Sequence, residues 1–248
     1  MTEIISIYII FFGDYFTRGV FMKRLPRGII ISCQLEPGDP VQDVSFIVNM
    51  AKSARYGGSI AIRTNNAEHV GAVKQAVDIP VIGLVKDRSY ETFITPTFDH
   101  AKSVIEAGAD FVAVDSTRGE RPIPLSRLFD QIRSNFPDVG IIADIADETD
   151  AELIIPLKPD YIATTLCGYT SYTEKVILPN ITLVGKLCAK FDIPIIAEGG
   201  YSTPEQVQLA FQMGAHAVVI GTAITRPWLV IKKFVESSTA FIKGRDEG

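Results

Sequence analysis

The chain has 248 residues, of which 24 are Lys or Arg and 29 are Asp or Glu, so its formal net charge is −5. Hydrophobic residues make up 47% of the sequence and charged residues 21%, which is typical of a globular protein and excludes collagen, a coiled coil and a disordered chain. The acidic balance disfavours nucleic-acid binding, and a length of about 250 residues fits either two small domains or one α/β barrel.

The first residues form an apolar run, IISIYIIFF at positions 4–12. The run is too short to span a bilayer, and Glu3 precedes it where a secretory signal needs positive charge. A second methionine, Met22, opens the segment before the first predicted strand. We expect residues 1–21 to be an extension from a misplaced start codon or, alternatively, a membrane-surface or partner-binding segment. Residues 22–248 are expected to form one domain.

From residue 28 onward, short runs rich in Val and Ile alternate with amphipathic stretches of helical length. The runs lack the polar alternation of a half-exposed strand, which is typical of parallel strands covered on both faces. We predict strands at residues 28–33, 59–63, 80–85, 111–115, 140–144, 161–164, 194–198 and 217–220.

Helix boundaries are marked between these strands. Thr203 followed by Pro204 is a helix start, because the threonine oxygen caps the helix and the proline needs no N–H donor there. Gly108 and Gly214 are placed where helices end, in two similar segments that each continue into a buried strand. This repetition of strand and helix predicts a (β/α)₈ TIM barrel. A doubly wound sheet is the alternative, but the turn SCQLEPGDP after the first strand lacks the G-x-G-x-x-G spacing.

The last predicted helix, residues 225–241, carries more apolar side chains than one face of a barrel needs. This pattern indicates either a dimer contact or ordinary packing on the barrel wall. The apolar residues are Trp228, Leu229, Ile231, Phe234, Val235 and Phe241.

Cysteine and histidine spacing gives no support for a disulfide framework or a protein metal site. Cys33, Cys167 and Cys188 form no C-x-x-C pair, and the three histidines form no H-x-x-x-H pair. We therefore expect a cytoplasmic protein without a metal, although carboxylates alone could hold magnesium.

Polar residues close most of the predicted strands. The active site of a (β/α)₈ barrel lies at the carboxyl ends of its strands, so these side chains are expected to converge on one mouth. Each of them could separately be a solvated charge or a helix cap, and the functional interpretation depends on that convergence. The strand-end residues are Gln34, Arg63, Lys86, Asp115, Asp144, Thr165 and Glu198.

The last two strand ends lead into glycine-rich turns. Backbone N–H groups in such turns bind anions, and the loops after strands 7 and 8 are the usual phosphate site of a barrel. The glycines could also be present only because a turn needs a positive φ angle. The candidate phosphate-binding residues are Gly199, Gly200, Gly221 and Thr222, with Arg226 as a side-chain clamp.

At these strand ends the sequence resembles the N-acetylmannosamine-6-phosphate 2-epimerases of bacterial sialic-acid and amino-sugar catabolism. The resemblance runs from about residue 23 to 242 and is carried by GIIISCQLEPGDP (28–40), GGSIAIRTNN (57–66), PVIGLVKDR (80–88), GADFVAVDSTRGERP (108–122), ATTLCGYTSYT (163–173), IPIIAEGGYSTPEQ (193–206) and GAHAVVIGTAITRP (214–227). Two departures are Cys167, where the family commonly has Ser, and ADIADETD (143–150), which replaces a more usual ADIST-type segment. These departures concern substrate preference more than the class of reaction.

The resemblance implies a cofactor-free interconversion of N-acetylmannosamine 6-phosphate and N-acetylglucosamine 6-phosphate in a cytoplasmic homodimer. Removal of the C2 proton needs a base, and the resemblance places the catalytic lysine at Lys86. Burial and the nearby Arg63 would lower the pKa of this lysine. Glu198 is the second candidate, for ring opening or for proton transfer at the opposite face. Whether one residue or two handle the proton stays open. The candidate substrate-binding residues are Gln34, Arg63, Asp144, Thr165 and Tyr169.

Other functions remain open from the residues alone. A barrel lyase would use Lys86 as a Schiff-base nucleophile. A sugar-phosphate sensor would keep the glycine turns and lose the base, whereas both Lys86 and Glu198 are present. A flavin-dependent barrel also uses such phosphate turns, but the sequence supplies no evident pocket for the flavin ring.

Overall fold

The computed structural model describes residues 24–246, with side chains described as far as residue 238. The extension expected at residues 1–21 lies outside the described residues. Within the described part of the chain, no helix is both long and apolar enough to cross a membrane.

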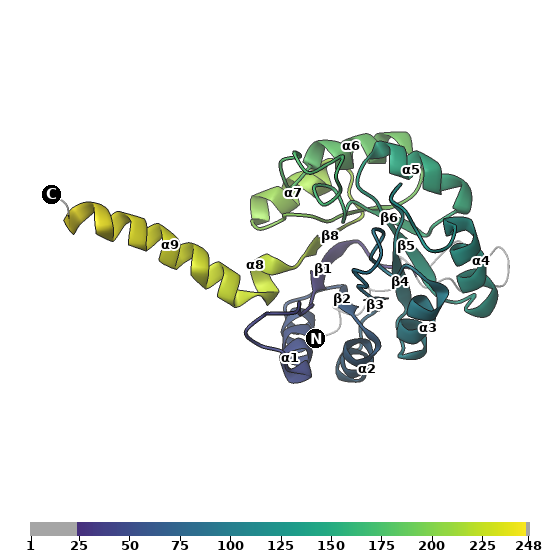
Figure 1. Cartoon of the computed structure of the whole chain (residues 1–248), viewed down its shortest axis with the longest axis horizontal. Helices are drawn as coiled ribbons and strands as arrows, with labels where there is room; N and C mark the ends of the chain where they lie inside the picture. Colours follow the sequence, from purple (N-terminus) through teal and green to yellow (C-terminus); the bar gives the residue numbers. More distant parts are fainter. Residues whose placement is uncertain (1–23, 247–248) are drawn as a thin grey trace, which may run out of the picture.

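The strands form a closed parallel barrel in which β1 to β8 follow one another in chain order and β8 pairs with β1 (Figure 1). The prediction of a (β/α)₈ barrel is therefore confirmed, and the doubly wound sheet is excluded. The observed strands lie within about two residues of the predicted ones. They are β1 (Gly28–Ser32), β2 (Ala61–Asn65), β3 (Val81–Leu84), β4 (Phe111–Asp115), β5 (Gly140–Asp144), β6 (Tyr161–Ala163), β7 (Ile195–Ala197) and β8 (Ala217–Ile220).

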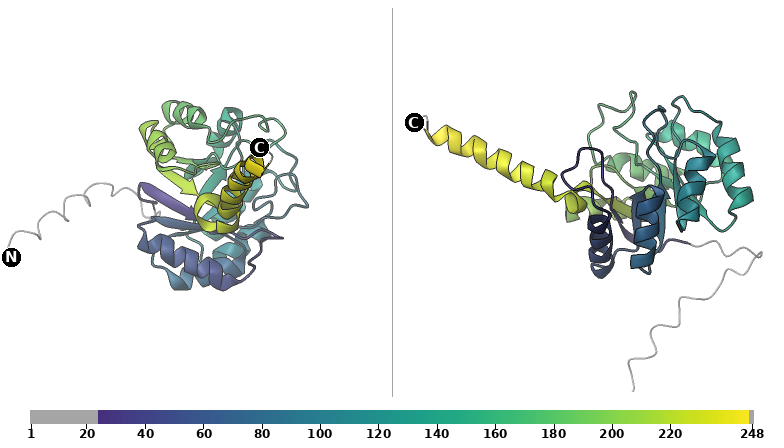
Figure 2. Two further views of the ribbon diagram at one scale, coloured as in Figure 1. Left: turned by 90° about the vertical axis from the view of Figure 1, so that its left-hand side faces the viewer. Right: turned by 60° about the horizontal axis from the view of Figure 1, so that its bottom comes forward.

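A ring of helices surrounds the barrel (Figures 1 and 2). The capping residues expected from the sequence start several of them; for example, Thr203 and Gln206 form a reciprocal capping box at α7. The helices of the ring are α1 (Val44–Tyr56), α2 (Ala67–Ala76), α3 (Phe98–Glu106), α4 (Leu125–Asn135), α5 (Glu148–Ile154) with the short η1 (Ile155–Leu157), α6 (Ile181–Lys190) and α7 (Pro204–Gln212).

The core has two layers because side chains alternate along each strand. Ile31 and Ile62 belong to the layer shared with the helices, whereas their neighbours Ile30 and Ala61 belong to a second cluster built mainly from strand residues. Phe111 fills this inner cluster against Gly140, where a Cβ atom would lie 2.2 Å from the phenylalanine ring. The barrel interior is therefore a packed core that closes the floor beneath the strand ends.

The carboxyl-terminal helix differs from the single helix predicted over residues 225–241. The chain forms a short α8 (Thr222–Thr225) and then α9 (Pro227–Asp246), which extends away from the barrel (Figures 1 and 2). Arg226 leaves the helical conformation between them, and Pro227 then starts a new helix because it needs no N–H partner at that position. Ile231, Phe234 and Val235 on α9 are 61%, 72% and 55% exposed, respectively.

Candidate active site

A pocket with a volume of about 640 Å³ opens at the carboxyl ends of the strands, a size that suits a small ligand. The structure brings the sequence-predicted residues together there, and Asp144 lies directly behind the pocket wall, bonded to Arg63 and Thr165. The predicted residues that line the pocket are Gln34, Arg63, Lys86, Thr165, Tyr169, Glu198, Gly199, Gly200, Gly221, Thr222 and Arg226.

Arg63 is the centre of a buried ion-pair network and is only 1% exposed. Its Nη1 and Nη2 atoms lie 3.2 and 2.6 Å from the two oxygens of Asp144, and Nη1 lies 3.4 Å from Glu198 Oε2. The Thr165 hydroxyl lies 2.6 Å from Asp144 and 3.1 Å from Glu198. Two carboxylates and one guanidinium are thereby held in a fixed arrangement in and directly behind the pocket wall, where solvent screens their charges weakly.

Burial favours the neutral form of Glu198 and raises its pKa, while Arg63 acts in the opposite direction. Burial alone would lower the pKa of Arg63, but the carboxylates of Asp144 and Glu198 raise it by more, so the guanidinium stays charged. Glu198 is therefore more easily protonated than an ordinary glutamate and suits a role as a proton donor.

Lys86 follows β3 on a segment whose backbone pairs with residues 93–94. Lys86 itself pairs with Ile94 in an antiparallel bridge, and the N–H of Asp87 donates to the carbonyl of Phe93 at 2.9 Å. The ammonium forms an ion pair with Glu36. Burial lowers the pKa of Lys86, Glu36 opposes this, and Arg63 lowers it further. Both conditions expected from the sequence for a basic lysine, burial and the nearby Arg63, are thus present.

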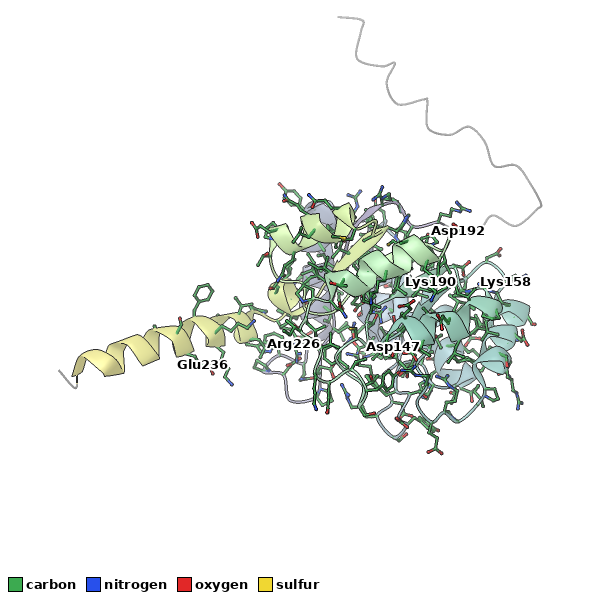
Figure 3. The ribbon with its side chains drawn as sticks, turned by 90° about the horizontal axis from the view of Figure 1, so that it is seen from above. Asp147, Lys158, Lys190, Asp192, Arg226 and Glu236 are labelled. Atoms are coloured by element: carbon green, nitrogen blue, oxygen red, sulfur yellow. The ribbon has the colours of Figure 1, made fainter. Side chains whose placement is uncertain are left out.

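The two glycine turns lie at the side of the pocket that follows β7 and β8. Gly199 and Gly200 have φ angles of 108° and 79°, and a Cβ atom on Gly200 would lie 2.6 Å from a Leu178 carbon. Both positions therefore require glycine. Arg226 lies where α9 leaves the barrel (Figure 3), and its guanidinium pairs with Asp39. The predicted phosphate clamp already has a carboxylate partner.

Glu36, Asp39 and Tyr201 were not predicted from the sequence. The two carboxylates follow Gln34 within the β1–α1 loop, and that proximity was the available signal. Tyr201 directly follows the glycine turn, lines the pocket and is only 4% exposed. Burial raises its pKa to about 12, and its hydroxyl has no hydrogen-bond partner among the described residues, so it is a neutral group available to a ligand.

Asp115 lies beside Asp144 across the β4–β5 pairing but does not line the pocket. Its Oδ1 atom accepts hydrogen bonds from the backbone and the hydroxyl of Thr117. Among the residues with described side chains, no group of three or more His, Cys, Asp or Glu is arranged as a set of metal ligands.

Replacing Asp115 with Asn is expected to stabilise the protein above neutral pH. Burial raises the pKa of Asp115 from 3.8 to about 6. Its stabilising contribution is therefore complete below pH 3.8 and is lost as the pH rises through about 6. Asparagine keeps the acceptor for Thr117 without the charge, so the gain is about 3 kcal/mol at about pH 8 and falls toward zero at about pH 4.

Thermal unfolding of both proteins across this pH range measures the effect. The exposed carboxylate of Asp130 on α4 provides the control, and Asp130→Asn should show no such gain. A pH-independent difference between Asp115→Asn and wild type would contradict the assignment.

Comparisons with known proteins agree on one family. The family model NanE, described as "Putative N-acetylmannosamine-6-phosphate epimerase", matches residues 47–240. A protein of Caldanaerobacter subterraneus subsp. tengcongensis named "Putative N-acetylmannosamine-6-phosphate 2-epimerase" is 41% identical over 228 residues, which cover 90% of this chain and 94% of that protein. A Staphylococcus aureus protein of the same name is 40% identical over 217 residues, covering 86% and 98%.

A solved structure shows the same relationship. The N-acetylmannosamine-6-phosphate 2-epimerase from Clostridium perfringens matches with a TM-score of 0.82 and 28% identity, over 90% of this chain and 99% of that one. A thiamine phosphate pyrophosphorylase from Pyrococcus furiosus, at 15% identity and a TM-score of 0.56 over 80% and 87%, shares the fold alone. The resemblance recognised in the sequence motifs is confirmed. The chain belongs to the N-acetylmannosamine-6-phosphate 2-epimerase family.

Proposed function

We propose that this protein interconverts N-acetylmannosamine 6-phosphate and N-acetylglucosamine 6-phosphate by moving the proton at C2, in amino-sugar and sialic-acid catabolism. The observation that carries the proposal is one pocket lined by a partly buried lysine, a partly buried glutamate and two glycine turns. The lysine and the glutamate provide proton transfer, and the turns provide backbone N–H groups for a phosphate.

The reaction requires the open-chain sugar, because only the aldehyde at C1 acidifies the C2 proton. Glu198, as the more easily protonated carboxyl, assists ring opening. The neutral amine of Lys86 takes the C2 proton, and the electrons of the C–H bond move onto the C1 oxygen as an enolate. The Arg63 guanidinium supplies positive charge for that oxygen. Return of a proton to the other face of C2 gives the epimer and needs no cofactor.

Proton NMR of N-acetylmannosamine 6-phosphate with the protein in deuterated water tests this function. We expect signals of N-acetylglucosamine 6-phosphate to appear and the C2 proton signal of both sugars to disappear. Unchanged spectra after prolonged incubation would refute the proposal. Borohydride treatment with substrate tests the lyase alternative, since a stable adduct on Lys86 is expected only if an imine forms.

Arg226 is proposed to exchange its Asp39 partner for the substrate phosphate. Arg226→Gln is expected to raise KM about tenfold or more with a smaller change in kcat, because one charge-assisted hydrogen bond is lost. Inorganic phosphate should inhibit the wild type competitively and the variant more weakly. Arg55→Gln is the control, because Arg55 pairs with Asp78 on the surface and does not line the pocket. Equal KM values for Arg226→Gln and wild type would exclude the clamp.

We also propose that the protein is a homodimer in which a second copy covers the apolar side chains of α9. Ile231, Phe234 and Val235 form an exposed apolar surface on a helix that stands away from its own barrel (Figure 2). The three cysteines are free, which agrees with the proposed cytoplasmic location, as does a phosphorylated substrate.

Light scattering is expected to give wild-type protein twice the mass of the 27.2 kDa chain. Phe234→Glu should shift the protein toward the monomer, since a carboxylate cannot be buried unpaired in an apolar contact. Lys232→Gln, on the same helix, should leave the mass unchanged. A monomeric wild type would end the dimer proposal.

A further inference from the structure

The β1–α1 loop carries a carboxylate, Glu36, into direct contact with the lysine of the active site. The Glu36 carboxylate forms ion pairs with Lys86 and, at 3.3 Å, with Arg88. The backbone of Glu36 is itself held in place: its N–H donates to Asp39 Oδ2 at 2.8 Å, and its carbonyl accepts from Gln42 Nε2 at 2.9 Å. Glu36 therefore approaches Lys86 from a loop whose shape is fixed by its own hydrogen bonds.

The Lys86 ammonium depends on this contact for its position. The backbone of Lys86 is fixed by its bridge to Ile94, but four flexible methylene groups separate the backbone from the charge. Among the described residues, Glu36 is the hydrogen-bond partner of the ammonium. A catalytic group must be held close to its reacting geometry, and that requirement makes the partner of a lysine important.

We infer that Glu36 is a positioning residue for the reaction: its carboxylate holds the Lys86 ammonium in the empty site and releases it when the phosphosugar binds. This inference rests on the proposed role of Lys86 as the base at C2. As the ion pair opens, the ammonium gives its proton to solvent water. The neutral amine then takes the C2 proton, and the electrons of that C–H bond remain on the enolate.

The charges around Lys86 give Glu36 a measurable influence on this step. Lys86 is faced by Glu36 from the β1–α1 loop, Arg63 from β2, Glu198 from the end of β7, and Arg88 from its own segment. Burial, Arg63 and Arg88 all lower the pKa of Lys86, whereas Glu36 raises it. Burial opposes ionisation of Glu36, but Lys86 and Arg88 lower its pKa overall, so it is charged near neutral pH.

The test is the pH profile of kcat/KM for Glu36→Gln, which keeps the size and an acceptor oxygen but removes the charge. Without the carboxylate, Lys86 loses its proton at lower pH, so the acid limb of the kcat/KM profile moves to lower pH. At the acid end, kcat/KM relative to its plateau should rise about threefold or more over wild type. The phosphate of the substrate titrates identically with both proteins, so the difference belongs to the enzyme.

Two further variants separate charge from position. Glu36→Asp retains the charge on a shorter arm, so we expect the wild-type acid limb with a lower kcat. Glu36→Ala loses both the charge and the contact with Lys86. We therefore expect its acid limb at the lower pH of Glu36→Gln, and a kcat reduced about tenfold with little change in KM. Asp87→Asn is the matched control: Asp87 adjoins Lys86 in sequence, but its carboxylate accepts from Ser89 and does not line the pocket.

An acid limb that is the same in wild type and Glu36→Gln would show a merely structural role and overturn the inference. If Glu36→Gln folds poorly, coincident limbs for Glu36→Asp and Glu36→Ala would do the same. A failure of the proposed function is distinguishable, because wild-type protein would then show no C2 exchange, or Lys86→Ala would retain it.

Discussion

Replacement of Lys86 with alanine is expected to abolish exchange of the C2 proton and to reduce kcat by about 10³-fold or more, as for the loss of a general base. The physical reason is that the pocket wall would lose the amine that burial and Arg63 favour in its neutral form. The fold should survive, because the side chain lies at the rim of the pocket and is 21% exposed. Proton NMR in deuterated water measures the C2 exchange, and a thermal melt measures whether the fold is retained.

Lys86→Arg provides a second, sharper variant. Arginine keeps a positive charge beside Glu36 but does not give up its proton near neutral pH. We therefore expect phosphosugar binding to persist while C2 exchange is lost. Lys102→Ala, an exposed helix position that pairs with Glu106, is the control and should retain full activity. Exchange by Lys86→Ala at a rate within tenfold of the wild type would remove Lys86 from the role of base.

The second large effect is expected at Arg63. Within residues 24–238, Arg63 is the only cation that forms ion pairs with Asp144 and Glu198, so Arg63→Met leaves these two carboxylates close together and largely buried. Loss of one partner from a buried ion pair costs about 3–5 kcal/mol, which corresponds to a fall in Tm of roughly 10 °C for a chain of this size. Activity should fall as well, because the enolate loses its nearby positive charge.

A double variant distinguishes unpaired charge from lost packing. Arg63→Met combined with Asp144→Leu removes one of the stranded carboxylates and should recover part of the lost stability, although not the activity. Arg55→Met is the control, since Arg55 forms its ion pair on the surface. Arg63→Met with a Tm no lower than that control would contradict a structural role for the network.

The barrel and its pocket could be predicted because they depend on local pattern. Runs such as 111–115 and 140–144 are apolar at consecutive positions, and parallel strands bring the residues that end such runs to the same end of the barrel. Convergence of Arg63, Lys86 and Glu198 follows directly from that geometry.

Contacts made by loops could not be predicted in the same way. The pairing of Glu36 with Lys86 depends on how residues 33–43 turn after β1, and several conformations of that loop suit the sequence. The path of α9 was also missed, because amphipathicity shows that a helix has an apolar face without showing what covers it. Arg226 was predicted as a phosphate clamp without its carboxylate partner for the same reason, since Asp39 lies on that loop.

The Asp39–Arg226 pair has a consequence for how the protein is made. The two residues are 187 positions apart, and the Thr225 hydroxyl donates to the carbonyl of Ser32 at 2.7 Å across a separation of 193. Both contacts join β1 or the loop after it to the segment that follows β8, so a chain growing on the ribosome holds Ser32 and Asp39 without Thr225 and Arg226 until α8 and the residue after it have emerged. Nearly the whole barrel must therefore be synthesised before the site for the phosphosugar exists, and a chain cut short before Thr225 would carry Lys86 and Glu198 without a complete place to bind substrate.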